Sequence, residues 1–360
     1  KAYPRVDALS GFVHFGCTSE DINSTAYSLL LKDFGAKEFM PLVNAVILEI
    51  ESLAKKYRSA PLLSRTHGQA ASPTTLGKEL LNAAARLHRP FDLLKTIPRT
   101  AKWSGAVGNF NAHAAAYPDQ DWIGITYRFL TYLGLSPNLY TTQIEPHDML
   151  AERFDAVGRI NTILLDFSRD MWMYISHGVF LQKPKQGEVG SSTMPHKVNP
   201  IDFENAEGNL GLANAIFRHL AEKLPISRLQ RDLSDSTVMR NIGVAFGHSL
   251  IAYRSILAGL QKIEADTARL ESELNEHWEV LTEAVQTIMR KYRVPAAYEK
   301  LKSLARGKKM GQKELHAFIR RLKIPNDDKK HLLSLNPQTY TGLAEKLVEG
   351  YFQSRAKNSL

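Results

Sequence analysis

The chain has 360 residues, of which 44% are hydrophobic and 23% are charged, and its formal net charge at pH 7 is +9. This composition is ordinary for a water-soluble globular protein, and no segment approaches the roughly eighteen uninterrupted apolar residues that a membrane span requires. Because the opening residues also lack the apolar run of a signal peptide, and the single Cys17 cannot form an internal disulfide, we expect a cytoplasmic protein without a membrane partner.

The first polar stretch, FGCTSEDINS at residues 15–24, has the pattern of a helix start. Thr18 or Ser19 is a suitable N-cap, and the carboxylates that follow would complete a capping box. Beyond this stretch, apolar residues recur every three or four positions in long segments, which is the periodicity of amphipathic helices. These segments cover residues 39–57, 75–96, 146–182, 201–224 and 237–265.

The segment 146–182 shows the helical period most clearly, with apolar residues from Leu150 to Ile175 on one stripe. At about 1.5 Å per residue, a helix of this length runs for about 50 Å, which is longer than a compact domain is wide. Further apolar residues, such as Ile163 and Trp172, lie outside that stripe. We therefore expect an all-α fold, an elongated bundle of long helices, in which some neighbouring helices come from other subunits.

The helical segments become shorter after residue 266. Segments 270–292, 296–306, 312–322 and 341–356 are separated by prolines and glycines, which end helices. We therefore divide the chain into a central helical bundle, residues 1–265, and a small C-terminal helical domain, residues 266–360.

Much of the basic excess lies in this C-terminal part. Within residues 299–331, lysines and arginines alternate with apolar residues at helical spacing, without the aromatic interleaving of single-strand binding surfaces. The pattern predicts solvated faces of amphipathic helices, and we expect no nucleic-acid partner.

Three more polar stretches, at residues 62–75, 187–200 and 228–241, are candidates for chemistry. The first and the last have ordinary explanations, because His67 could be a hydrogen-bonded loop histidine and Arg231 and Arg240 could be surface cations. The histidines show neither an HExxH pattern nor Cys/His ligand spacing, so we expect no metal and no cofactor.

Several familiar motifs are incomplete. The stretch 187–200 lacks the Gly-Lys-Ser/Thr ending of a phosphate-binding loop, and GAVGNF at residues 105–110 has part of a dinucleotide fingerprint without a predicted strand before it. A Ser-His-Asp hydrolase built on Ser191 and His67 is disfavoured, because the GxSxG elbow is absent.

The stretch GEVGSSTMPHKVNP at residues 187–200 is hard to explain as a plain connector. Its glycines and prolines indicate a loop that presents the serines, and Pro200 marks the entry to the next helix. Helix N-termini attract anions and Lys197 is adjacent, so the stretch indicates a pocket for a carboxylate or a developing negative charge. A catalytic loop is therefore a better interpretation than a linker.

Residues 190–200 also match, without a break, the signature GSSxMPxKxNP of the fumarase/aspartase superfamily, which the chain resembles through nearly its whole length. The histidine in MPHK and the stretches CTSEDIN, SRTHGQ, YTTQIEPHD and RDLSDSTVMRN are similar to the adenylosuccinate lyases of that superfamily. This family eliminates fumarate from adenylosuccinate to give AMP, and from SAICAR to give AICAR, in purine biosynthesis. The resemblance implies a carbon–nitrogen lyase that acts on these nucleotides.

The resemblance also implies which residues perform the elimination. Removing a proton beside a carboxylate concentrates negative charge, and the leaving nitrogen needs a proton, so the reaction requires a base, an acid and nearby donors. Ser191 would be the general base, on a loop that closes over the substrate. His67 would be the general acid, and Glu204 would orient it.

Further residues are implied to bind the substrate. Those placed near the succinyl carboxylates and neighbouring atoms are Thr18, Ser19, Thr66, Gln143, Lys197 and Asn199. Those placed at the nucleotide end are Arg231, Ser236 and Arg240, and the two arginines suit a phosphate group.

The family assembles as a homotetramer in which three subunits contribute to each active site, and the resemblance implies the same assembly here. Family members also begin with a further N-terminal helical domain, which we expect to be absent from this chain.

Two alternatives stay open beside this interpretation. The first is argininosuccinate lyase or another lyase of the superfamily, and the second is a noncatalytic scaffold fragment that keeps the lyase fold. The enzyme is favoured over the scaffold, because the residues implied in catalysis and binding are present at Ser191, His67, Lys197 and Glu204.

Overall fold

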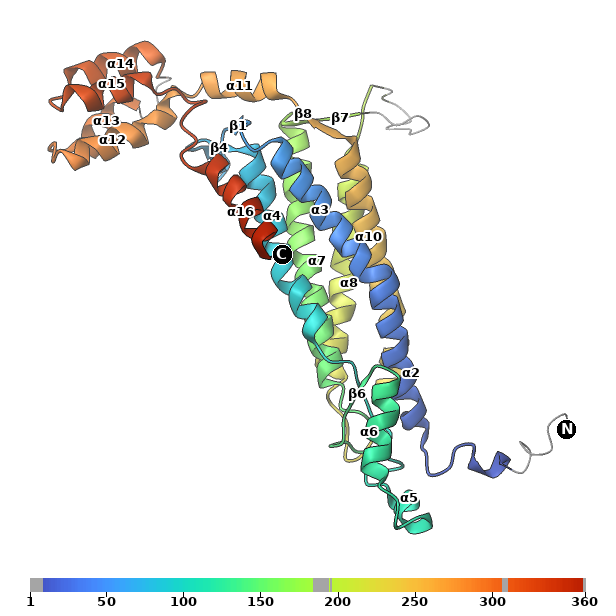
Figure 1. Ribbon diagram of the computed structural model, residues 1–360. Coiled ribbons are helices and arrows are strands. Elements are labelled where there is room, and N and C mark those ends of the chain that lie inside the picture. The colour runs from blue at the N-terminus through green and yellow to red at the C-terminus, as the bar shows by residue number, and fades with distance from the viewer. Residues whose placement is uncertain (1–8, 184–193, 195, 306–309, 359–360) are drawn as a thin grey trace. The chain divides into compact units, whose positions relative to one another are not determined.

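The computed structural model describes residues 9–183, 194, 196–305 and 310–358, and it is built mainly of long and short helices (Figure 1). The all-α architecture with long helices, predicted from the apolar periodicity, is confirmed. The α-helices are α2 (Ser19–Phe34), α3 (Met40–Lys56), α4 (Leu76–Thr96), α5 (Asn111–Ala116), α6 (Trp122–Tyr132), α7 (Asp148–Ser176), α8 (Ile201–Lys223), α9 (Ser234–Met239), α10 (Ile242–Lys262), α11 (Thr267–Asn275), α12 (Thr282–Lys291), α13 (Ala297–Ala305), α14 (Gln312–Arg321), α15 (Asn326–Ser334) and α16 (Ala344–Asn358).

Short strands, which the sequence did not indicate, connect some of these helices. They are β1 (Pro61–Leu62), β2 (Arg65–Thr66), β3 (Gln69–Ala70), β4 (Thr74–Thr75), β5 (Thr100–Ala101), β6 (Ser136–Pro137), β7 (Phe180–Gln182) and β8 (Ile263–Ala265). The pairs β1–β4, β2–β3 and β7–β8 are antiparallel, whereas β5–β6 is parallel. Strands of two or three residues have too few positions to show alternation, so they cannot be recognised from periodicity.

The chain remains helical from Ser19 to Lys56. Helix α2 passes into a π-helical segment, Gly35–Phe39, and this segment passes directly into α3. The predicted helix start is confirmed, with Thr18 as the N-cap and Asp21 completing the capping box.

Helix α7 was predicted to reach residue 182 but ends at Ser176. Gly178 adopts a left-handed conformation with φ +73°, and the N–H of Val179 donates to the carbonyl of Tyr174 at 2.8 Å. This is the hydrogen bond of a Schellman C-cap, which satisfies a carbonyl at the helix end and turns the chain out of the helix. The last residues of the predicted helix form β7 instead.

Other helix predictions need smaller corrections. The predicted helix 237–265 is divided between α9 and α10 and gives way to β8 after Lys262. The predicted helix 270–292 is interrupted after Asn275 by a 3-10 turn, Trp278–Leu281, before α12 begins. Helices α5, α6 and α15 were not predicted.

The chain forms two compact units. Unit 1 comprises Lys1–Ile47, Arg86–Arg169 and Ile201–Ala258, and unit 2 comprises Leu48–Ala85, Asp170–Pro200 and Gly259–Leu360. The predicted domain boundary at residue 265 stays a prediction.

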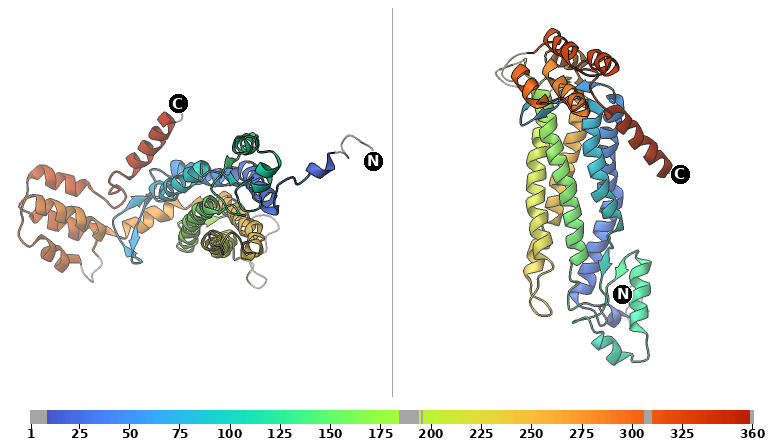
Figure 2. Two further views of the ribbon diagram at one scale, coloured as in Figure 1. Left: turned by 90° about the horizontal axis from the view of Figure 1, so that it is seen from below. Right: turned by 90° about the vertical axis from the view of Figure 1, so that its left-hand side faces the viewer.

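Aromatic side chains form the centre of unit 1. Phe246 of α10 lies 5.2 Å from Phe39 and 4.9 Å from Phe217 between ring centroids, and Phe154 of α7 lies 5.4 Å from Phe217 of α8. Within this unit α7, α8 and α10 run side by side, as both views of Figure 2 also show. Rings at such distances and angles combine a large buried area with favourable edge contacts.

Unit 2 has an apolar core of its own. The buried residues of this core are Leu63, Leu274, Val280, Leu281, Ala284, Val285, Met289, Ala297, Leu301, Met310, Leu315, Ile319, Leu322, Ile324 and Leu332. Leu63 lies between β1 and β2, so the segment that carries His67 is anchored to this core.

One helical stretch among the described residues, Ser234–Lys262, is long and apolar enough by composition to cross a membrane, with a mean hydropathy of 1.2 over its best window. Of that window, 44% is buried, and core helices of soluble proteins have the same properties.

Candidate functional site

The N-terminus of α2 carries the first predicted binding residues, Thr18 and Ser19. The N–H of Thr18 donates to Oδ2 of Asp21 at 2.7 Å, which is the reciprocal bond of the capping box. The capping bond fixes the backbone of Thr18 at the point where the helix begins, and Ser19 follows as the first helical residue.

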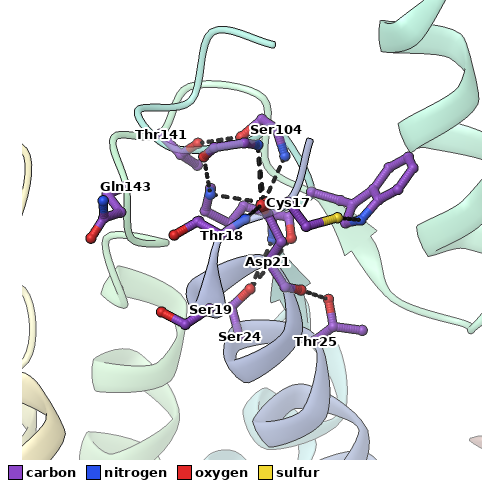
Figure 3. A network of polar contacts seen from close by, with 12 residues as sticks. Cys17, Thr18, Ser19, Asp21, Ser24, Thr25, Ser104, Thr141 and Gln143 are labelled. Carbon is purple, nitrogen blue, oxygen red and sulfur yellow. Dashed lines mark hydrogen bonds and ion pairs between the residues drawn. The ribbon is translucent and has the colours of Figure 1, made fainter. Parts of the chain in front are cut away.

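Asp21 is the centre of a buried polar network (Figure 3). Its Oδ1 accepts from Nζ of Lys102 at 2.8 Å and from the N–H of Ser104 at 2.8 Å, and the N–H of Gly105 lies 3.2 Å from both carboxylate oxygens. The side chains of Asp21 and Lys102 are both fully buried. The loop that follows β5 is thus bound to the start of α2.

Arg231 contacts two predicted binding residues, Ser19 and Gln143, which lie far from it and from each other in the sequence. Its Nη1 donates to Oε1 of Gln143 at 3.1 Å and to Oγ of Ser19 at 3.3 Å. Its Nη2 forms an ion pair with Oε1 of Glu20 at 2.9 Å, in which the two side chains are only 15% and 6% exposed. The contacts of Ser19 and Gln143 with one guanidinium show that these distant stretches meet.

Among the described residues, Arg231 donates from both terminal nitrogens of its guanidinium but not from Nε. Its Nε is buried and has no hydrogen-bond partner among the described residues. A buried donor without a partner is costly. An anionic oxygen of a ligand is the type of acceptor that would remove this cost.

The segment before α9 is shaped by Asp232. The carboxylate accepts from the N–H of Ser234 at 2.8 Å and from the N–H of Arg228 at 3.1 Å. The hydroxyl of Ser234 also donates to this carboxylate. This hydrogen bond has the largest effect, and together with the two backbone bonds it lowers the pKa of Asp232 to about 2. A carboxylate that stays ionised holds the turn that presents Arg231.

Ser236 and Arg240, which were predicted at the nucleotide end, lie farther along the same segment. Ser236 is half-buried in α9, and Arg240 is exposed at the C-cap of that helix. Among the described residues no hydrogen bond joins either side chain to Arg231.

His67 lies at the tip of a two-residue β-hairpin. Strands β2 and β3 pair with Thr66 opposite Gln69, and the loop residues His67 and Gly68 have φ of +53° and +75°. Two successive left-handed residues are typical of a type I′ turn, whose twist matches that of the strands. The turn leaves the imidazole of His67 exposed, together with Thr66.

A cavity of about 430 Å³ lies beside this hairpin in unit 2, a volume in the range of small-molecule sites. Thr66 and Arg65 line it, but so do the carboxylates of Glu79, Asp170 and Glu273, and Arg65 is already paired with Glu273. This excess of carboxylates disfavours an anionic nucleotide, so the cavity does not by itself account for the predicted substrate site.

Ser191, the predicted general base, lies outside the described residues. Lys197 and Asn199 are described: Lys197 is exposed and its N–H donates to the carbonyl of Met194 at 3.1 Å, and Asn199 is half-buried. Glu204 is exposed in the first turn of α8, where carboxylates stabilise a helix.

The structure therefore brings together part of the predicted site. Ser19, Gln143 and Arg231 meet in unit 1, next to Thr18, and Glu204, Ser236 and Arg240 belong to the same unit. Thr66, His67, Lys197 and Asn199 belong to unit 2. Sequence analysis did not identify Glu20, Asp21 and Lys102 as part of the site, because a carboxylate in a capping box gives no sign of its partners at distant positions.

Two family profiles match the chain, and together they cover most of its length. The profile of the lyase family matches residues 3–215, and that of the adenylosuccinate lyase C-terminal region matches residues 227–341. Curated adenylosuccinate lyases are similar along almost the whole chain. That of Legionella pneumophila (strain Corby) is 56% identical over 340 residues, which is 94% of this chain and 75% of the relative.

Two further relatives agree with this match. The adenylosuccinate lyase of Vibrio cholerae (strain O395) is 53% identical over 97% of this chain and 76% of its own length, and that of Escherichia coli (strain K12) is 52% identical over 96% and 76%. Among solved structures, 3-carboxy-cis,cis-muconate lactonizing enzyme from Pseudomonas putida has a TM-score of 0.81 at 23% identity, covering 99% of this chain and 80% of that chain. At this identity the likeness concerns the fold alone.

Proposed function

The chain belongs to the adenylosuccinate lyase family, and we propose that it catalyses the reaction of that family, the elimination of fumarate from adenylosuccinate to give AMP. The observation that carries this proposal is the similarity to curated adenylosuccinate lyases through nearly the entire chain. The same chemistry on SAICAR, which gives AICAR and fumarate, extends the proposal to two steps of purine biosynthesis.

The proposed elimination needs a base and an acid on opposite sides of the bond that breaks. Ser191 removes the proton beside the substrate carboxylate, and His67 donates a proton to the departing nitrogen. An ordinary serine hydroxyl is far too weakly acidic for this step, so it requires a closed, cationic environment that stabilises the oxyanion. Glu204 orients His67 in the assembled site.

The position of His67 is consistent with an acid that meets substrate. The type I′ turn holds the imidazole at the tip of a short hairpin, and the core beneath Leu63 anchors the hairpin base. A side chain presented in this way keeps its reach toward a ligand while its backbone is constrained.

Substrate binding is proposed to centre on the guanidinium of Arg231. The substrate carries two carboxylates and a phosphate, and planar guanidinium groups recognise such anions through paired hydrogen bonds. Support comes from the unused Nε of Arg231 and from its contacts with Ser19 and Gln143. Thr18, Thr66, Lys197, Asn199, Ser236 and Arg240 are proposed to complete the contacts.

A homotetramer with composite sites forms part of the proposal. The proposed acid His67 and the guanidinium of Arg231 belong to different units. Apolar side chains are also exposed on helices, including Val244 and Ile251, which are seven residues apart on α10 and are each about half exposed. Residues at this spacing lie on one helix face, which suits contact with a helix of another subunit.

The proposal is tested by following the absorbance change on mixing the purified protein with adenylosuccinate, with fumarate identified as a product. We expect fumarate release, and its absence from a folded, assembled protein would refute the proposal. In the same assay Ser191→Ala should lower kcat by more than about a hundredfold.

His67 requires a substitution that respects its backbone. Asn tolerates a positive φ, and Asn-Gly is the favoured pair in a type I′ turn, so His67→Asn removes the imidazole without straining the hairpin. It should lower kcat as strongly as His67→Ala. Arg231→Ala should instead act mainly on KM, and near-normal kinetics of any of these variants would remove its assigned role.

A further inference from the structure

The ion pair between Asp21 and Lys102 is unusual in its burial. Both side chains are fully excluded from solvent, and their charged atoms lie 2.8 Å apart. Removing two charges from water is costly, and apolar residues of similar size often serve stability equally well. Stability alone therefore gives no reason for a lysine at this position.

Helix capping does not explain the lysine either. In the capping box the carboxylate of Asp21 has one task, which is to accept from the N–H of Thr18, and such caps work at exposed helix ends without a buried cation. Lys102 does more, because its Nζ also donates to the carbonyl of Gly105 at 2.9 Å. Together with the backbone bonds of Ser104 and Gly105 to Asp21, this contact fixes the whole turn 102–105 against the start of α2.

The turn 102–105 is also connected to the segment that carries Gln143. The hydroxyl groups of Ser104 and Thr141 lie 3.2 Å apart, a hydrogen bond visible in Figure 3. Farther along the turn, Gly108 has φ +84°, and a Cβ at this position would lie 2.2 Å from the carbonyl oxygen of Thr141. Gly108 of the GAVGNF stretch therefore permits close packing of two loops, which gives a structural reason for a glycine in a motif that resembled part of a dinucleotide fingerprint.

The two segments that this turn connects both contact the guanidinium of Arg231. Ser19 follows the cap that Asp21 fixes, and Gln143 follows Thr141 by two residues. Oγ of Ser19 and Oε1 of Gln143 then accept hydrogen bonds from the same Nη1 of Arg231. Both segments therefore meet at Arg231.

We infer that Asp21 and Lys102 are positioning residues, which set the spacing between the Thr18–Ser19 segment and the Thr141–Gln143 segment so that Arg231 is directed at the substrate. The inference rests on the proposed function for its ligand. Neither side chain touches substrate, since both are buried, and they act through the backbone of residues 18, 104 and 105.

The main test replaces the pair by a neutral one, Asp21→Asn with Lys102→Met in a single protein. This double variant leaves no buried charge without a partner, so we expect it to fold. The matched control is Asp33→Asn with Lys37→Met, because this pair has the same residue types at 2.9 Å but is 60% and 71% exposed.

We expect the kcat/KM of the buried double variant, per folded enzyme, to be lower than that of the control by about tenfold to a hundredfold, since small misplacements of binding groups are costly. Its kcat should keep the pH profile of the wild type, because the proposed acid and base are untouched. A kcat/KM within about twofold of the control would overturn the inference, even if the melting temperature fell.

A second variant keeps the inference testable if the double variant does not fold. Ser104→Ala removes the hydroxyl link to Thr141 and retains the buried pair, and it should lower kcat/KM by about twofold to tenfold, the effect of one hydrogen bond. An unchanged kcat/KM in this variant would contradict the proposed connection.

Hydrogen exchange separates this inference from the proposed function. In the neutral double variant the amides of Thr18, Ser104 and Gly105 should exchange faster than in the exposed control, whether or not adenylosuccinate is the substrate. If the wild type does not release fumarate, the proposed function fails. If these amides stay protected, the positioning role fails.

Discussion

His113 is a titratable side chain in an apolar environment. It is 1% exposed, with its ring centroid 4.8 Å from that of Trp122 and 5.7 Å from that of Trp103. Neither ring nitrogen has a hydrogen-bond partner among the described residues. Burial lowers the pKa of His113, an effect that the charge of Asp21 opposes and that of Lys102 reinforces, so the folded state favours the neutral ring.

This environment predicts a loss of stability in mild acid. Below the ordinary histidine pKa of 6.5 the unfolded chain binds a proton that folded His113 resists, so the free energy of unfolding should decrease as the pH falls through that value. His113→Phe should remove this part of the pH dependence. The measurement is the urea midpoint of both proteins at about pH 7.5 and about pH 5.5.

The comparison concerns the change with pH, because a phenyl ring also alters packing against Gly16, next to the imidazole. His219→Gln is the control, since His219 is exposed on α8 and should leave the pH dependence as it is in the wild type. If His113→Phe loses as much stability in acid as the wild type, the buried ring is not the cause.

For individual residues, the sequence predicted only those contacts whose partners lie a few positions apart. The capping box at Thr18 was recognisable because its partners are three residues apart. The ion pair of Arg231 with Glu20 spans 211 positions, and that of Lys102 with Asp21 spans 81, and no spacing in the sequence relates such residues. The resemblance to a family supplied Ser19, Gln143 and Arg231 as candidates but not the carboxylates that hold them.

Among the helices, the approach of α4 to the end of α3 depends on one glycine. A Cβ at Gly77 would lie 2.4 Å from the carbonyl oxygen of Ala54 and 2.5 Å from Cα of Arg58. Both atoms belong to the backbone, so neither can move aside as a flexible side chain would. The N–H of Gly77 also donates to the carbonyl of Tyr57 at 2.9 Å, which holds the two segments together.

We expect Gly77→Ala to destabilise the protein by about 1–3 kcal/mol, because the backbones must separate to admit the methyl group. Gly350→Ala is the matched substitution, since nothing lies within 4 Å of a Cβ at this position in α16. It should stabilise the protein by about 0.5–1 kcal/mol, the usual gain of alanine over glycine inside a helix. Urea unfolding of both variants at one protein concentration measures the two effects, and equal effects would contradict the role of Gly77.

Apolar periodicity identified most long helices but not their ends. It located α3, α4 and α8 to within a residue or two, since each of these has a continuous apolar face. It extended α7 too far, because the end of that helix depends on the left-handed Gly178, and a single glycine inside an apolar pattern does not reveal its φ. The break between α9 and α10 at Arg240 leaves the apolar pattern intact and was missed for a similar reason.

For the molecule as a whole, the proposed assembly explains why the site residues of one chain are divided between units. His67 belongs to unit 2, whereas Ser19, Gln143 and Arg231 belong to unit 1. In a homotetramer with composite sites, a residue of one chain needs to meet residues of other chains rather than its own. Such an arrangement is invisible in a single sequence, because sequence separation carries no information about contacts between copies.

This arrangement predicts that two inactive variants restore each other. If His67 and Ser191 of one site come from different subunits, mixed tetramers of His67→Asn and Ser191→Ala chains contain sites in which both residues are intact. With random mixing at equal amounts, half of the chains supply each intact residue, so about a quarter of the wild-type activity should return. The two chains are denatured together, refolded and assayed with adenylosuccinate.

The control separates complementation from contamination or refolding effects. Each variant refolded alone should remain inactive, and a chain that carries both substitutions should not be rescued by either parent beyond the activity of that parent. If both residues of a site came from the same chain, every site would lack one of them, and the mixture would be as inactive as its parts. Activity that stays at that level in tetramers shown to be mixed would contradict composite sites for His67 and Ser191.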